Sequence, residues 1–210
     1  MPLVQIIRSG NATIGIWEMS ETVDELIGLL DPESGDLCEM NQYAAGSRKR
    51  EFLTVRTLLR EMLGHYPSIR HDHRGKPQLL TSPRHLSISH SRKLTTVILA
   101  DVPAGIDTEE TTRRVADIAK RYLAEDELCW TSLASNPDLA RLFCWCCKEA
   151  VYKMVGMDRI DFKKQISVSA TEFHDTGVTG AVFISGNDTR TLKINYLFRN
   201  GDVIVWCTFD

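Results

Sequence analysis

The sequence predicts a fold that mixes α-helices with antiparallel β-strands, and three patterns carry this prediction. Apolar residues recur at three- and four-residue steps over 47–63 and again between Pro137 and Gly156, which is typical of helices with one buried face. Residues 85–91 alternate between apolar and polar side chains, as a strand does. Short strand-like runs then follow one another to the end of the chain, and Asn200-Gly201-Asp202 between the last two is a signal for a tight hairpin.

Other elements follow from local signals. Thr22 and Glu25 have the spacing of a capping box at the start of a helix, which Asp31-Pro32 would end near Leu30. The apolar run 94–100 reads as a strand buried on both faces. Further strands are expected at 12–19, 166–170, 178–185, 191–198 and 203–209, and an amphipathic helix at 115–123.

The composition is that of an ordinary globular protein. The chain has 210 residues, of which 43% are hydrophobic and 25% charged, with a net charge of −3. The acidic balance argues against binding of nucleic acid over the whole surface, and no apolar run reaches the length of a membrane span. Residues 1–7 are too short an apolar run for a secretion signal, so we expect a cytoplasmic protein.

The cysteines are expected to be reduced thiols that pack in the core. Cys144, Cys146 and Cys147 suggest a metal site, but they lie inside a predicted helix, where neighbouring side chains diverge by about 100°. No second pair stands at a spacing typical of zinc sites. His71-Asp72-His73 is similarly explained by a polar loop between elements.

Residues 104–110 read as a strand end that carries two carboxylates. Ile106 points to one side, and Asp107 and Glu109 point to the other, because side chains alternate along an extended chain. Two carboxylates held close repel each other, and a Mg²⁺ ion relieves that repulsion. Acidic residues that simply face water remain the alternative.

The helix after residue 136 has a charged stripe along the margin of its buried face. Asn136-Pro137-Asp138 is a good helix start, and Gly156 a good stop. Trp145, Glu149 and Lys153 fall in one stripe beside the apolar face, a position that suits the lining of a cleft. The alternative is a surface ion pair between Glu149 and Lys153.

Two of these stretches together carry a family resemblance. Gly105-Ile106-Asp107-Thr108-Glu109, followed about forty residues later by Trp145-Cys146-Cys147-Lys148-Glu149-Ala150 and then Lys153, resembles the 4′-phosphopantetheinyl transferases. Gly75-Lys76-Pro77 and the segment 87–91 also resemble that family, with Ser87 where asparagine is usual. The resemblance implies an α+β fold of two similar α/β halves, residues 1–103 and 104–210, that form a pseudo-dimer with the active site in the cleft between them.

The resemblance also implies an activity. A monomeric enzyme of this family transfers the 4′-phosphopantetheine arm of coenzyme A to a serine of an apo acyl, peptidyl or aryl carrier protein, with Mg²⁺, and releases 3′,5′-ADP. It implies that Asp107, Glu109 and Glu149 hold the metal. Glu149 would also help to deprotonate the serine, directly or through a metal-bound water, and Lys153, with Lys148 nearby, would offset the charge of the diphosphate.

The coenzyme A site is implied in the same way. Besides the two lysines just named, the resemblance assigns it Arg48, Arg56, Lys76, Ser89 and His90. The residues alone leave a solvated basic helix face open for the arginines, and a core histidine for His90, which shares the face of Leu86 and Ile88. The rival functions are another Mg²⁺-dependent phosphate-transfer or hydrolysis enzyme, and a non-catalytic module that binds carrier proteins or coenzyme A. The sequence does not identify the carrier protein or its pathway.

Overall fold

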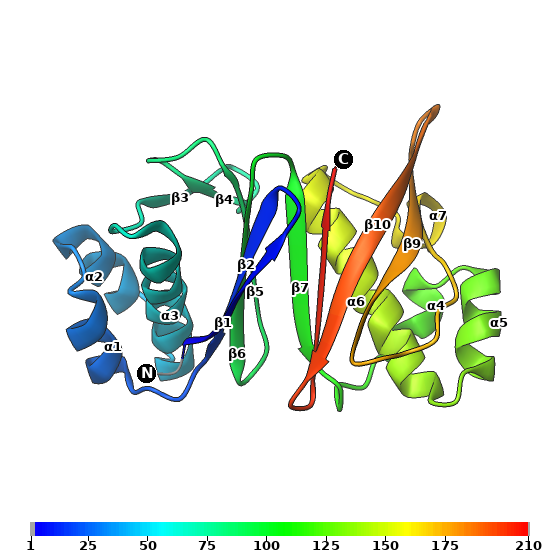
Figure 1. Cartoon of the computed structure of the whole chain (residues 1–210), viewed down its shortest axis with the longest axis horizontal. Helices are drawn as coiled ribbons and strands as arrows, with labels where there is room; N and C mark the ends of the chain where they lie inside the picture. The colour runs from blue at the N-terminus through cyan, green and yellow to red at the C-terminus, as the bar shows by residue number, and fades with distance from the viewer. Residues whose placement is uncertain (1–2, 210) are drawn as a thin grey trace.

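The computed structural model describes residues 3–209, and the side chains of residues 5–209. Within this range the chain forms two antiparallel sheets with helices on their outer sides (Figure 1). The strands are β1 (Leu3–Ser9), β2 (Ala12–Glu18), β3 (Ile69–His71), β4 (Pro77–Leu79), β5 (His85–His90), β6 (Leu94–Ala100), β7 (Ala104–Glu110), β8 (Ile166–Val168), β9 (Thr176–Ser185), β10 (Asp188–Arg199) and β11 (Asp202–Thr208). The helices are α1 (Val23–Leu30), α2 (Ser34–Asn41), α3 (Gly46–Leu63), the 3₁₀ turn η1 (Ala116–Ile118), α4 (Ala119–Tyr122), α5 (Glu125–Leu133), α6 (Pro137–Val155) and α7 (Phe162–Gln165).

The first sheet has the strand order β1-β2-β6-β5-β4-β3 and is covered by α3. Apolar side chains of α3, among them Leu58 and Leu59, pack against Trp17 and Val97 of the sheet. Helices α1 and α2 then cover the far side of α3. Every residue of β6 is buried, which confirms the strand predicted to be covered on both faces.

The second sheet has the order β7-β11-β10-β9-β8 and is covered by α6. As predicted, Asn136 caps this helix, because its side chain accepts from the Leu139 nitrogen at 3.1 Å, and Gly156 ends it with a positive φ of 62°. Cys144, Cys146 and Cys147 are fully buried free thiols in its core, which confirms their packing role.

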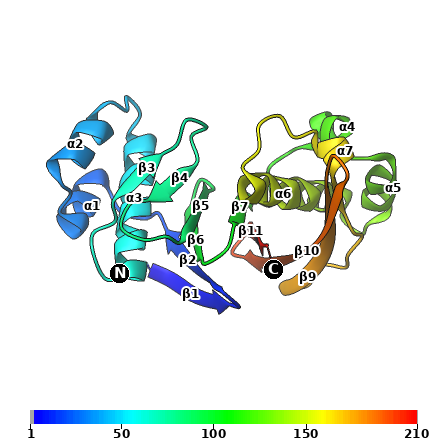
Figure 2. The ribbon, with the colours of Figure 1, turned by 90° about the horizontal axis from the view of Figure 1, so that it is seen from above.

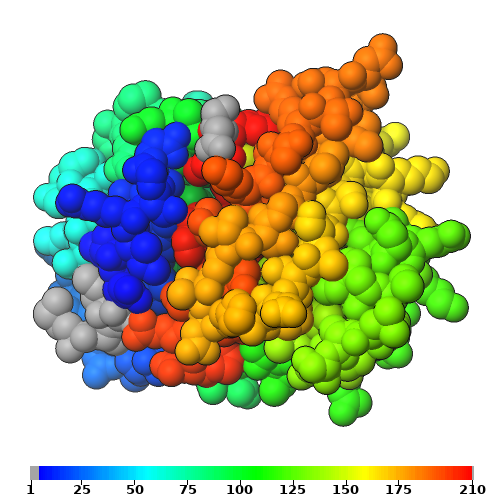
Figure 3. Space-filling view, turned by 45° about the vertical axis from the view of Figure 1, so that its right-hand side comes forward, coloured from blue at the N-terminus to red at the C-terminus, as the bar shows by residue number. Residues whose placement is uncertain are grey.

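The two sheets pack against each other in the middle of the molecule. Ile14 of β2 and Ile98 of β6 share an apolar cluster with Ile106 of β7 and Trp206 of β11. The layers therefore run helix, sheet, sheet, helix (Figure 2). Figure 3 shows the blue amino-terminal part of the chain beside the red and orange carboxy-terminal part. Between β10 and β1, Arg199 donates to Gln5 at 2.8 Å.

This architecture confirms a mixed α/β protein with two α/β halves. That the halves repeat each other as a pseudo-dimer stays a prediction, and so does their boundary. No helix in residues 3–209 combines the length and apolarity needed to cross a membrane.

Several parts of the chain differ from the prediction. The sequence did not indicate β1, β3, β4, α2, α5 or α7, and the helix expected at 115–123 is a 3₁₀ turn followed by one short helix. That helix stops because Leu123 and Ala124 are extended, and the Glu127 side chain accepts from the Ala124 nitrogen to begin α5 instead. The predicted hairpin is confirmed, since Asn200 and Gly201 both have positive φ.

Candidate active site

Two serine side chains of β5 join the sheets where β5 and β7 meet. The Ser87 hydroxyl accepts from the Ile106 nitrogen at 3.3 Å, and the Ser89 hydroxyl accepts from the Thr108 nitrogen at 3.1 Å. Backbone groups buried at such a junction require a partner, and here the hydroxyls take the place of strand carbonyls. The alternating Ser-x-Ser pattern of β5 therefore fixes β7 beside it.

On its other side, β7 touches the backbone of α6. A Cβ atom at Gly105 would overlap the Ala150 carbonyl oxygen and lie 2.7 Å from the Met154 nitrogen. Only glycine leaves room for this approach, because the obstacle is rigid backbone rather than a flexible side chain. The close approach brings Lys153 of α6 over the strand.

Asp107, Lys153 and Ser89 meet at this point. The Lys153 ammonium donates to the Asp107 Oδ1 atom at 2.8 Å, to the Ser89 hydroxyl at 3.0 Å and to the Ile106 carbonyl at 3.1 Å. Ser89 in turn donates to Asp107 Oδ1 at 2.9 Å. Asp107 is buried, and its second oxygen, Oδ2, has no hydrogen-bond partner. One carboxylate oxygen at the junction is thus left without a donor.

Glu149 lies close enough to Asp107 and Lys153 for their charges to shift its pKa. Burial raises the pKa of Glu149, and the negative charge of Asp107 raises it further, while Lys153 and Arg113 lower it. A carboxylate with a raised pKa accepts a proton more readily than an ordinary one. Because Lys153 also contacts Asp107, the predicted stripe of α6 faces β7.

Glu109 also lies on the predicted side of β7, where it forms an ion pair with Arg113. Glu110, one residue further along, instead pairs with Arg92 at 3.2 Å. These contacts agree with the predicted alternation. Asp107 and Glu109 each have a cationic partner, Lys153 and Arg113, which offsets the expected repulsion between the two carboxylates of the strand.

The predicted metal site involves the same carboxylates. In the described range, no three His, Cys, Asp or Glu side chains are grouped closely enough to hold a metal ion. The donor chemistry nevertheless fits a hard cation, since Asp107 has an unpartnered buried oxygen and the charge of Asp107 raises the pKa of Glu149. Glu109 would join such a set only if Arg113 moved away from it.

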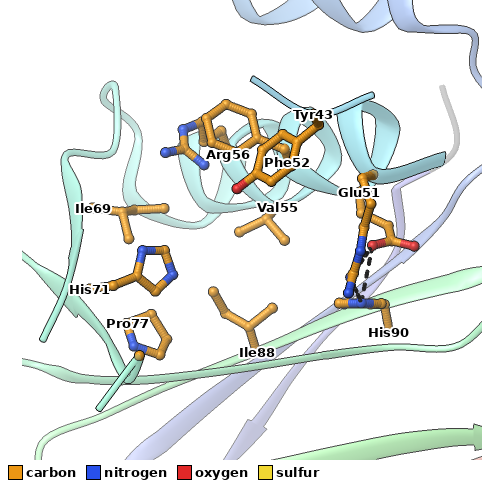
Figure 4. A pocket seen from close by; sticks show the side chains of 12 residues that line it. Tyr43, Glu51, Phe52, Val55, Arg56, Ile69, His71, Pro77, Ile88 and His90 are labelled. Atoms are coloured by element: carbon orange, nitrogen blue, oxygen red, sulfur yellow. Dashed lines mark hydrogen bonds and ion pairs between the residues drawn. The ribbon is translucent and has the colours of Figure 1, made fainter. Parts of the chain in front are cut away.

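A cavity of about 390 Å³, here called the α3 pocket, lies between α3 and the strands β3 to β5 (Figure 4). Its wall combines apolar and charged side chains: Tyr43, Arg48, Glu51, Phe52, Val55, Arg56, Ile69, His71, Gly75, Pro77, Ile88 and His90. Three of the predicted coenzyme A residues, Arg48, Arg56 and His90, are therefore brought together.

These three residues differ in how exposed they are and in how firmly other side chains hold them. Arg56 is buried, pairs with Asp36 at 2.9 Å, and stacks on the Phe52 ring with its guanidinium carbon 3.4 Å from the centroid. Arg48 is 61% exposed at its side chain and lies at the pocket mouth beside His90. Arg48 is thus available to a ligand, whereas Arg56 is held by the fold.

A second cavity of about 380 Å³, the α6 pocket, opens between the β3–β4 turn and the end of α6. Lys76 and Lys153 both line it, and Pro77 and Ile88 are shared with the α3 pocket. The Lys76 ammonium donates to the Met154 carbonyl at 3.1 Å, so it caps the carboxyl end of α6. The two pockets therefore adjoin along Ile88 and Pro77, with Lys153 in the second.

Two predicted ligand contacts need correction. Lys148 is fully buried, and its ammonium donates to Glu127 at 2.6 Å and to the carbonyls of Tyr122, Phe162 and Ile166, so it has no free donor for a diphosphate. The Ser89 hydroxyl is buried and already has one acceptor and two donors, so it holds Asp107 and Lys153 rather than facing a ligand.

Sequence reasoning also missed several residues. Glu51 lies between Arg48 and His90, and nothing in its local pattern marks it among the other charged residues of α3. Arg113 is four residues after Glu109, but that spacing indicates a contact only inside a helix. The role of Gly105 depends on how closely a helix distant in sequence approaches it.

Comparison with known proteins gives one match. Residues 103–198 match the family model of the 4′-phosphopantetheinyl transferase superfamily. That span contains β7 and α6, and with them Asp107, Glu109, Glu149 and Lys153. No curated protein matches the chain. Residues 103–198, a little under half of the chain, are therefore similar to the 4′-phosphopantetheinyl transferase superfamily.

Proposed function

We propose that this protein transfers the 4′-phosphopantetheine arm of coenzyme A to a serine of an apo acyl, peptidyl or aryl carrier protein and releases 3′,5′-ADP. The superfamily domain supports phosphopantetheine transfer in general. The finer proposal rests mainly on one observation, the contact of Lys153 with Asp107 at the junction of α6 and β7, where one Asp107 oxygen is unpartnered.

The two pockets support coenzyme A as the donor. The α3 pocket offers apolar walls such as Val55 and Ile88 for a nucleobase, and Arg48 and His90 for the 3′-phosphate. A ligand that crosses Ile88 and Pro77 from there reaches the α6 pocket and Lys153, whose charge suits the diphosphate. We assign Lys76 to the diphosphate end as well, which requires it to leave the Met154 carbonyl.

The chemistry is one displacement at phosphorus. The serine oxygen of the carrier forms a bond to the phosphorus next to pantetheine, and the bond from that phosphorus to the bridging oxygen breaks. The bridging oxygen leaves with 3′,5′-ADP. Glu149 takes the serine proton, a role its raised pKa favours, and Lys153 offsets negative charge on the transferred group. Alignment and charge compensation are the main contributions that such a reaction needs from a protein.

A divalent cation is the cofactor we expect. Asp107 and Glu149 would hold Mg²⁺, with Glu109 once Arg113 releases it. When bound, the ion neutralises charge on the diphosphate oxygens.

The test is intact-mass spectrometry of apo acyl, peptidyl and aryl carrier proteins incubated with the protein, coenzyme A and Mg²⁺. The proposal expects one phosphopantetheinyl group on the carrier serine and an equal amount of 3′,5′-ADP. A binding module would retain coenzyme A or carrier without modifying it. A hydrolase would release nucleotide with no carrier present. Either result contradicts the proposal.

A further inference from the structure

Glu51, His90 and Arg48 make a closed cluster at one end of the α3 pocket. Arg48 Nη1 lies 2.7 Å from Glu51 Oε2 and 3.2 Å from His90 Nε2, and the same Glu51 oxygen lies 3.2 Å from His90 Nε2. Figure 4 shows Glu51 and His90 side by side at the pocket end, away from Arg56. A carboxylate thus already sits between the two groups assigned to the phosphate.

The hydrogen bonds of this cluster cannot all form at once. His90 Nε2 can accept from Arg48 only without a proton, and can donate to Glu51 only with one. Burial lowers the pKa of His90, which favours the neutral ring. The other ring nitrogen, Nδ1, is buried without a partner. The cluster is therefore held by charge between Arg48 and Glu51 more than by a complete set of hydrogen bonds.

The cluster is also easily opened. The side chain of Arg48 is 61% exposed and that of Glu51 is 21% exposed, so water can replace their contact. Arg56, by contrast, is buried with Asp36 and Phe52 and keeps its partners. An anion entering the α3 pocket competes with Glu51 for Arg48, and a phosphate, with nearly two negative charges, competes better than a singly charged group.

We propose that Glu51 is a built-in counter-ion that the 3′-phosphate of the ligand displaces, and that it sets the selectivity of the α3 pocket. This inference rests on the proposed function, because it takes Arg48 and His90 as the 3′-phosphate site. Without a ligand, Glu51 pairs with the Arg48 guanidinium and lies beside His90, so free inorganic phosphate binds poorly there. The 3′-phosphate of a nucleotide displaces Glu51, because the base and the diphosphate of the same ligand bind elsewhere and hold the phosphate in place.

Calorimetry with Glu51→Gln tests this. The ligands are coenzyme A, 3′-dephospho-coenzyme A and inorganic phosphate, all measured in the same buffer. Glu61→Gln is the matched control, since Glu61 is exposed on the same helix and is not part of the pocket wall. Melting temperatures establish that both variants are folded.

The expected result is a larger preference for the 3′-phosphate. Glu51→Gln should raise the ratio of coenzyme A affinity to dephospho-coenzyme A affinity by up to about fivefold, the upper end for one charge contact near a surface. Inorganic phosphate should bind Glu51→Gln more tightly than the wild type. Glu61→Gln should leave the ratio and the phosphate affinity unchanged.

The failures are distinguishable. If the wild-type protein prefers coenzyme A but Glu51→Gln leaves that preference unchanged or reduces it, Glu51 is not displaced and the inference is wrong. If Glu61→Gln raises the ratio equally, general charge is the cause and the inference is also wrong. If the wild-type protein binds both coenzymes equally, the placement of the 3′-phosphate fails, and transfer itself is then judged by the carrier assay.

Discussion

Gly105 of β7 and Ala150 of α6 are in backbone contact, and a Cβ atom on Gly105 would overlap the Ala150 carbonyl oxygen. This contact sets the distance between a strand that carries Asp107 and a helix that carries Glu149 and Lys153. The candidate active site is thus built by close packing of two backbones, with its charged side chains added on top.

Replacement of Gly105 by alanine should therefore separate α6 from β7. Backbone cannot yield as a side chain can, so we expect Gly105→Ala to lower the free energy of unfolding by about 3 kcal/mol, at the upper end for added bulk in a packed core. Any transfer activity should fall with it, since Lys153 would move away from Asp107. Chemical denaturation monitored by tryptophan fluorescence measures the stability change.

The matched control is Gly180→Ala in β9. A Cβ atom there would meet only the Ser169 side chain, at 3.0 Å from its oxygen, and this side chain can rotate. Gly180→Ala should be clearly milder than Gly105→Ala. Equal stability of the two variants would contradict the proposed role of the backbone contact.

Lys148 should be a stability residue. Its ammonium and Glu127 form a fully buried ion pair that ties α6 to the start of α5, and Glu127 also accepts from the Val168 nitrogen at 2.8 Å. Removal of one partner leaves a buried charge, so Lys148→Met should cost about 3–5 kcal/mol in denaturation experiments.

Two comparisons sharpen that expectation. The double variant Lys148→Met with Glu127→Gln should recover part of the loss, and Lys163→Met at an exposed position should be nearly neutral. Where Lys148→Met remains folded, its affinity for coenzyme A should stay within about twofold of the wild type. If the variant were as stable as the wild type but bound coenzyme A much more weakly, Lys148 would be a ligand-binding residue after all.

Asp202 should make stability depend on pH. This carboxylate is buried, and its Oδ1 atom has no partner. Burial raises the pKa of Asp202 above its ordinary 3.8, with Glu110 adding to the effect and a hydrogen bond to Ser91 opposing it. A raised pKa means that the folded state disfavours the charged form, so stability is full below the ordinary pKa and is lost as the pH rises through the raised one.

Asp202→Asn removes that penalty. At pH 7 the melting temperature of the variant should be about 2–4 °C above that of the wild type, which corresponds to roughly 1 kcal/mol in the free energy of unfolding for a chain of this size. At pH 3 the two melting temperatures should be equal. Asp188→Asn, at an exposed position of β10, is the control. A variant less stable than the wild type at pH 7 would show that the charge of Asp202 stabilises the fold.

The sequence predicts the elements that carry the site because their signals are local. The cap at Asn136, the stop at Gly156 and the alternation of β7 are each set within a few residues. The burial of the charged side chains and their ion-pair partners could not be predicted from such local signals. Lys148 adjoins Glu149 in sequence, yet it is buried because Glu127, 21 residues earlier, supplies its counter-charge. Glu51 reaches His90 only through the packing of α3 on β5.

The most direct test of the account is the rate of carrier modification, followed by intact-mass spectrometry, for the wild-type protein, Asp107→Asn and Glu110→Gln. The two carboxylates lie on the same strand but face opposite sides, Asp107 toward Lys153 and Glu110 toward Arg92. We expect Asp107→Asn to fold and to lose about two to three decades in rate, as for removal of a transition-state electrostatic group. Glu110→Gln should react nearly as the wild type does. A wild-type rate in Asp107→Asn, or an inactive Glu110→Gln, would contradict the placement of the active site at the junction of β7 and α6.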